Sequence, residues 1–147
     1  MNDMIWFYAV GLPLLIIIFT WASWAGALWF CARSSGWAKL AQQYGMSFPE
    51  NSSPRSLRYL GLGQRKPLMY NNAIRAHILT QTLHLRPTFL AKSSHQPLAI
   101  PLADLKFGTE NSADKANRTA TLRLVPGHKI WFTSADATWI IAAKETG

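Results

Sequence analysis

The residues that could do chemistry are few, and four of them alternate along two neighbouring runs of β-forming residues. Arg75, His77, His84 and Arg86 are each flanked by apolar residues in a period of two. A strand places successive side chains on opposite faces. A turn centred on residues 80–81 would therefore set His77 opposite His84 and Arg75 opposite Arg86. This pairing predicts a hairpin with one apolar face and one basic face, and we call those four residues the basic face.

Three kinds of chemistry fit the basic face, and the sequence leaves them open. Like charges directly opposite each other are unfavourable in a sheet, so the face either lies in solvent or meets an anionic lipid or an acidic protein. A histidine pair could hold a metal ion, but zinc sites need three or four ligands, and no third ligand is evident beside His77 and His84. We therefore expect no metal and no cofactor.

The other polar residues give no catalytic constellation. His95 and His128 lie in turns, where His128 is expected to be exposed. Asp104 is the acid expected to have a structural partner. As a lone carboxylate it supplies no acid–base pair for catalysis. The segment 61–66 lacks the spacing of a phosphate-binding loop. The only cysteine, Cys31, excludes a disulfide within the chain. We expect a protein that is not an enzyme.

These residues follow a long apolar stretch, Met4 to Cys31, that contains no charged residue. As a helix it would span roughly 42 Å, more than the ~30 Å hydrocarbon core of a bilayer. A cleaved signal peptide is disfavoured, because the run is too long and no Lys or Arg precedes it. We expect a transmembrane anchor over residues 1–32, bent where Pro13 removes a backbone hydrogen bond.

Charged residues orient this helix, and aromatic residues mark its two ends. All 15 Lys and Arg follow it, so the positive-inside bias places the C-terminal domain in the cytoplasm and the N-terminus outside. Aromatic residues cluster at both ends of the span, as they do where a helix meets the lipid headgroups. The predicted membrane-interface residues are Trp6, Trp29, Trp37, Arg33 and Lys39.

The inner half of the span carries small residues. Ala22 and Gly26 have the spacing that lets the backbone of another helix approach closely, and Thr20 and Ser23 could hydrogen-bond across such a contact. These four are the predicted helix-docking residues. Small residues are also common in lone membrane helices, so the spacing leaves open whether the helix has a partner.

A short amphipathic helix and a turn-rich linker are expected over residues 33–54. Trp37, Leu40, Ala41 and Tyr44 recur on one helical face, and Gly45 is expected to end the helix. This apolar stripe could lie on the inner membrane surface or pack on the domain that follows.

The segment 55–147 predicts a small antiparallel β domain. Its β-forming runs give five to seven strands, joined by connections too short for crossover helices. The runs are 57–62, 73–79, 82–90, 97–105, 119–125 and 130–133. A last helix, capped by Ser134, is expected to cover one end of the sheet. The fold class is therefore α+β, with a transmembrane helix, a short amphipathic helix, and a partly open barrel or sandwich with a C-terminal capping helix.

Two segments carry a resemblance to known domains. The run 79–87, LTQTLHLRP, followed by 97–105, PLAIPLADL, resembles the pattern of pleckstrin-homology-like (PH-like) and GRAM-like domains. An anchor, then GWxxLAxxY over 36–44, then such a domain is similar to small uncharacterised bacterial single-pass membrane proteins. The resemblance implies a PH-like binding or scaffolding domain at the bacterial inner membrane.

These observations predict a non-catalytic accessory or scaffolding subunit of a larger inner-membrane complex. It would dock on integral membrane protein subunits through its transmembrane helix and its cytoplasmic PH-like domain. The alternative is a membrane-anchored adaptor that binds anionic lipid or an acidic protein through the basic face. Residues 33–92 hold nine Lys or Arg and one acid, so the basic half is the one joined to the membrane. Nucleic acid is not expected as a partner, because no exposed strand aromatics interleave with the basic residues.

Overall fold

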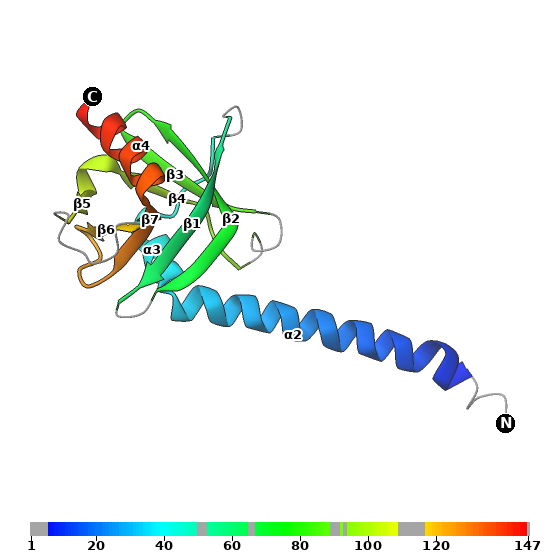
Figure 1. Ribbon diagram of the computed structural model, residues 1–147. Coiled ribbons are helices and arrows are strands. Elements are labelled where there is room, and N and C mark those ends of the chain that lie inside the picture. The colour runs from blue at the N-terminus through cyan, green and yellow to red at the C-terminus, as the bar shows by residue number, and fades with distance from the viewer. Residues whose placement is uncertain are drawn as a thin grey trace.

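The computed structural model describes residues 6–49, 53–64, 67–88, 92, 94–108 and 117–146. Its helical part begins with a π-helical turn, η1 (Phe7–Gly11), which continues into α2 (Leu12–Ser34). Figure 1 shows them as one long helix that projects from the rest of the molecule. Met4 and Ile5, the start of the predicted span, lie outside the described residues.

The helix from Phe7 to Ser34 is long and apolar enough to cross a membrane, with 28 residues and no buried residue in its most apolar window. A π-helical turn precedes Pro13, in which the Leu12 amide donates to the Phe7 carbonyl, and the bend expected at Pro13 stays a prediction. Pro13 itself lies in the first turn of α2. A proline is tolerated there because its missing N–H removes no bond from within the α-helix.

The described residues form seven strands in one sheet, in which every pair of neighbours is antiparallel, as predicted. They are β1 (Arg55–Gly63), β2 (Leu68–Leu79), β3 (Thr82–Pro87), β4 (Leu98–Pro101), β5 (Leu105–Phe107), β6 (Asn117–Leu122) and β7 (Lys129–Thr133). Their order is β4-β3-β2-β1-β7-β6-β5. The sheet curls into a nearly closed barrel (Figure 1).

One predicted strand is wrong. The sequence predicts a single strand over 97–105, but this segment forms β4 and β5 at the two opposite edges of the sheet, joined by the 3₁₀ turn η3 (Leu102–Asp104). Pro101 ends β4 because it has no N–H for the ladder. The Leu102 amide instead donates to the Gln81 carbonyl, at 2.8 Å. Three residues span at most about 10 Å, so the two edges lie close together and the barrel nearly closes.

Several strand boundaries also differ from the prediction: the predicted run 57–62 lies within the longer β1, and β6 ends at Leu122, before the predicted end at Val125. β2 starts at Leu68 and continues through Asn72, whose left-handed φ of 51° lies near an irregularity in the β1–β2 register. Asparagine tolerates this conformation better than most residues. β3 ends at Pro87, and the Thr88 amide donates to the Ala73 carbonyl. Residues 89–90, the end of the predicted strand, lie outside the described part of the chain.

The core lies inside the barrel, and α3 (Trp37–Tyr44) supplies part of it. Trp37, Leu40 and Tyr44 are buried in the same cluster as the strand residues. The apolar stripe of this helix therefore packs on the domain, which decides between the two placements that the sequence left open. The helix ends at Tyr44 as predicted, and the Gly45 amide donates to the Ala41 carbonyl.

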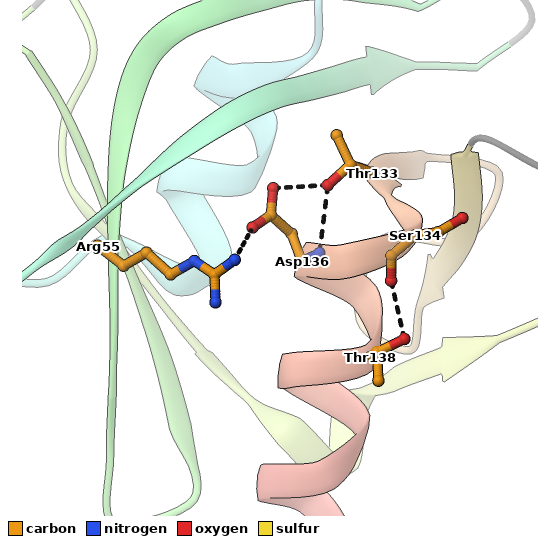
Figure 2. A network of polar contacts seen from close by, with 5 residues as sticks. All are labelled: Arg55, Thr133, Ser134, Asp136 and Thr138. Atoms are coloured by element: carbon orange, nitrogen blue, oxygen red, sulfur yellow. Dashed lines mark hydrogen bonds and ion pairs between the residues drawn. The ribbon is translucent and has the colours of Figure 1, made fainter.

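The last helix, α4 (Ser134–Glu145), packs on the barrel as predicted, with Ile140 fully buried. Its cap is Thr133 and not the expected Ser134. The Thr133 hydroxyl accepts from the Asp136 amide at 3.2 Å and donates to the Asp136 carboxylate at 2.8 Å. The same carboxylate pairs with Arg55 at 3.1 Å (Figure 2). Thr133 can cap because it is the last extended residue before the helix.

Candidate functional site

The first candidate site is the surface of α2, which is exposed along most of its length. Trp6, Ala22, Ser23 and Gly26 are all exposed. A Cβ added to Gly26 would meet no atom within 4 Å. We call Ala22, Ser23 and Gly26 the docking strip. The fold leaves room there for the close approach of another helix.

Thr20, the fourth predicted helix-docking residue, lies beside the docking strip. It is six residues from Gly26, which places it about a third of a turn around the helix. Its hydroxyl donates to the Ile16 carbonyl of the same helix at 2.7 Å. The hydroxyl proton is therefore already engaged in a hydrogen bond within α2.

The predicted membrane-interface residues divide into two groups. Trp29, Arg33 and Lys39 are exposed, and the Arg33 guanidinium lies over the Trp29 ring at 4.9 Å. The prediction is wrong for Trp37, which is 1% exposed. Its indole N–H donates to the Gln96 carbonyl at 2.8 Å. The chain changes direction at Gly36, between α2 and α3, and the Trp37 side chain is therefore buried in the barrel core.

A buried polar chain, which we call the junction, joins the end of α2 to β2. The Ser35 and Tyr70 hydroxyls are 2.9 Å apart, and the Tyr70 hydroxyl lies 3.0 Å from His95 Nε2. The Ser94 hydroxyl lies 2.8 Å from His95 Nδ1. Burial raises the pKa of Tyr70 to about 12, so its hydroxyl stays protonated at neutral pH. The junction is thus a buried hydrogen-bonded network that fixes the end of α2 on the barrel.

The turn from α2 into α3 depends on Gly36. Its φ of +83° is left-handed, and an added Cβ would lie 2.5 Å from two ring atoms of His128. His128 is therefore buried, which contradicts the expected exposure. Burial lowers its pKa, and the charge of Lys39 adds to this effect. The Nδ1 atom of His128 is buried without a hydrogen-bond partner in the described part of the chain.

The second candidate site is the basic face, and its predicted register is confirmed. In the β2–β3 hairpin, His77 pairs with His84 and Arg75 pairs with Arg86. The turn falls on residues 80–81, whose φ values of 47° and 59° are both left-handed. Two such residues match the type of two-residue turn that suits the twist of a hairpin.

Phe48, from the linker after α3, covers half of the basic face. Its ring lies edge-on to His84, with centroids 6.2 Å apart, and beneath the guanidinium of Arg86 at 4.6 Å. His84 is therefore buried, and burial, with the nearby His77, lowers its pKa. This corrects the prediction that His84 offers its side chain to an anionic partner.

The arginines of the basic face border an open pocket. It is lined by Arg75, Arg86, Pro87, Thr88 and Lys92, and we call these residues the cationic pocket. None of the described residues that line it is acidic. The ion pairs among the described residues join Arg55 with Asp136 and Arg123 with Asp104, and none involves the three cations of the pocket. Three positive charges thus border one small space.

Asp104 has the structural partners that were expected. Its carboxylate lies 2.7 Å from Arg123 and accepts from the Tyr44 hydroxyl at 3.2 Å. Burial raises the pKa of Tyr44. Asp104 therefore links η3, α3 and the loop after β6.

A second open pocket lies where β1 and β2 meet the start of α4. It is lined by Arg58, Tyr59, Asn71, Asn72, Asn117, Thr133, Ser134 and Ala135. Among these residues, Ser134 was expected from the sequence to cap the last helix, and the hydroxyl of Thr133 is the one that caps α4.

The residues of these sites supply cations, hydroxyl groups and exposed apolar side chains. Within the described ranges, no three His, Cys, Asp or Glu residues lie close enough to hold a metal ion. Sequence reasoning missed Tyr70, Phe48 and Lys92. Tyr70 contacts residues 35 and 25 positions away, and no local spacing signals such a contact.

Comparison with known proteins adds no assignment to these surfaces. No family model, no curated protein and no solved structure matches the chain. The function therefore has to be argued from the geometry of the described residues.

Proposed function

We propose that the chain is a non-catalytic accessory or scaffolding subunit of a larger bacterial inner-membrane complex. In this proposal α2 crosses the bilayer once, and the barrel contacts the same complex from the cytoplasm. One observation carries the proposal: α2 is exposed along most of its length, yet its last turn is fixed to the barrel. Such a helix needs lipid or protein to cover its apolar side chains.

The fixed junction favours a docking role over a simple tether. Ala32 and Ser35 are 4% and 2% exposed, and only two residues separate α2 from α3. Ser35 also contacts Tyr70 of β2. A tether needs a flexible linker between helix and domain. This short, buried connection instead holds the barrel in one orientation relative to α2, as a subunit with two points of contact requires.

The docking strip is the part of α2 that we assign to a protein partner. Small side chains at Ala22 and Gly26 let helix backbones approach closely, and packing of this kind drives helix association in lipid. Both residues are exposed. The bulky Trp21 and Trp24 lie on neighbouring parts of the helix and would remain toward lipid or rim the contact.

The orientation and the domain class are parts of the same proposal. The Lys and Arg residues that follow α2 favour a cytoplasmic barrel and an external N-terminus. A PH-like assignment is supported by the order of elements, in which seven antiparallel strands precede one C-terminal helix. The run of 97–105 that carried the resemblance forms the crossing from β4 to β5.

The proposal is tested by a substitution that fills the docking strip. The full-length chain is purified from native membranes in mild detergent, and we expect it in a stoichiometric complex with an integral membrane protein. Gly26→Leu should dissociate this complex, because it adds a bulky side chain where helices approach closely. The matched control is Ile17→Leu, nine residues away and half a turn around the helix. It should leave the complex intact.

Gly26→Leu should not unfold the chain, because the space around Gly26 is open and leucine is a better helix former than glycine. Recovery of the wild-type chain alone would reject the subunit proposal and favour an adaptor that acts by itself. Equal loss of the complex in both variants would reject the docking strip as the contact.

A further inference from the structure

We propose that the cationic pocket binds a phosphate-type oxyanion. This inference concerns the surface of the barrel and goes beyond the subunit proposal, which rests on α2. It starts from the pairing of Arg75 with Arg86 in the β2–β3 register.

Directly opposed like charges destabilise a sheet. Arg75 is exposed and Arg86 is half-buried, so their repulsion is only partly screened by water. No described acidic residue forms an ion pair with either side chain. An anion held between the two guanidinium groups would turn this repulsion into attraction.

Phe48 holds the guanidinium group of Arg86 in place before a ligand binds. Its ring lies 4.6 Å from the Arg86 guanidinium carbon, a distance at which the ring face attracts the cation. A stacked guanidinium keeps its N–H groups at the ring edge, free to donate in plane. The side chain therefore loses less conformational entropy when an anion binds.

Two further donors complete the pocket. Thr88 follows the last residue of β3 and is one of the residues that line the pocket, and its amide is engaged with the Ala73 carbonyl. Lys92 adds an ammonium group from the connection after β3. Two guanidinium groups, one ammonium and one hydroxyl form a donor set that matches a ligand with several charged oxygens.

The compactness of the pocket favours a phosphate group over an acidic peptide. Its three cations border one space, where they suit a single group with more than one negative charge. An acidic peptide carries its charges one by one along an extended chain. The two sources of such a group are a lipid headgroup and free inorganic phosphate, which the probes below distinguish. In Figure 1, β2 lies on the side of the barrel toward which α2 extends, as access to headgroups requires.

The test measures binding by calorimetry with the full-length chain in a neutral detergent. The probes are inorganic phosphate and glycerol 1-phosphate, the latter standing for the headgroup end of a phospholipid. We expect saturable binding that weakens by about tenfold or more in the double variant R75Q/R86Q, because the variant removes both guanidinium groups and hydrogen bonds from charged donors are the strong ones. Tighter binding of glycerol 1-phosphate indicates a lipid source, and tighter binding of inorganic phosphate indicates a free one.

The matched control is the double variant K106Q/K129Q, which removes two exposed positive charges from β5 and β7. It should keep the wild-type affinity. If R75Q/R86Q does not fold, Lys92→Gln replaces it, because Lys92 lies outside every strand; a clear loss of affinity is expected there too.

Three outcomes would overturn the inference. One is the absence of binding by either probe, and another is an equal loss of affinity in the control variant. The third is binding of an oligoglutamate peptide through Arg75 and Arg86 when neither phosphate binds, which would assign the pocket to an acidic protein.

Discussion

The imidazole of His128 fills the space where a side chain on Gly36 would lie. A Cβ on Gly36 would come within 2.5 Å of ring atoms Cδ2 and Nε2. Gly36 forms the left-handed turn between the apolar helix and α3, and His128 lies just before β7. One residue pair therefore couples the path of the chain out of α2 to the start of β7, an interior strand of the barrel.

Gly36→Ala should lower the free energy of unfolding of the barrel by about 2–5 kcal/mol. About 1–2 kcal/mol comes from the left-handed backbone, and about 1–3 kcal/mol from overpacking against His128. Gly127→Ala is the matched control, because Gly127 has nearly the same φ, +84°, but open space around its Cβ. Gly127→Ala should lower the free energy of unfolding only by the contribution of the left-handed backbone. Urea unfolding in detergent, followed by near-UV circular dichroism, gives both values.

The contact with His128 can be isolated in the same experiment. Adding His128→Ala to Gly36→Ala should recover part of the loss, because it removes the ring that the new methyl group meets. Equal destabilisation by Gly36→Ala and Gly127→Ala would show that His128 does not limit this position.

Tyr70→Phe should destabilise the barrel by about 1–3 kcal/mol at neutral pH, because it leaves the buried His95 Nε2 without its hydroxyl partner. It should also change the response to alkali. The folded pKa is about 12 against an ordinary value of 10, so the unfolded state loses its proton first, and wild-type stability falls as the pH rises from about 10 to 12. Unfolding of the variant should depend less steeply on pH there. If the stability of the wild type and of the variant fell equally with rising pH, the pH dependence could not be assigned to Tyr70.

Acid should destabilise the barrel through His84 and His128. Burial lowers the pKa of both below the ordinary 6.5, so the unfolded state binds protons more readily. Their contribution to stability is therefore present above about pH 6.5 and is lost as the pH falls below it. The double variant H84Q/H128Q should lose less stability than the wild type between pH 7.5 and 5.5. A loss as large as that of the wild type would mean that other groups control the acid response.

Thr133→Ala should cost about 0.5–2 kcal/mol, the usual effect of removing a helix cap. The hydroxyl satisfies the Asp136 amide and donates to its carboxylate, which also pairs with Arg55 (Figure 2). Thr133→Ser keeps this hydroxyl and should remain within a few tenths of a kcal/mol of the wild type. Thermal unfolding of the two variants decides whether the hydroxyl or the methyl group of Thr133 matters.

Arg75→Gln should stabilise the barrel by about 0.2–1 kcal/mol when no phosphate is present, because it removes one of two directly opposed charges. Added salt should reduce this gain by screening the repulsion in the wild type. Arg86→Gln should gain less, since it also loses the contact with Phe48. A less stable Arg75→Gln variant in low salt would show that the repulsion is already relieved within the chain.

The sequence by itself determined the features that depend on neighbouring residues. Alternation along 74–86 predicts the register of the β2–β3 hairpin, because strand geometry and a two-residue turn leave one pairing that keeps Ile78 and Leu83 on the same face. The length and apolarity of the first helix follow from composition alone. The apolar stripe of α3 is likewise visible in its spacing.

Only the tertiary structure decided where those features are buried. Trp37 has the residue type of a membrane-interface aromatic, and its place in the core follows from the left-handed turn at Gly36 and a hydrogen bond to Gln96, 59 residues away. His84 has the alternation of an exposed residue, but Phe48 covers it. Burial results from contacts between distant segments, and a periodic pattern tells which residues share a face but not what covers that face.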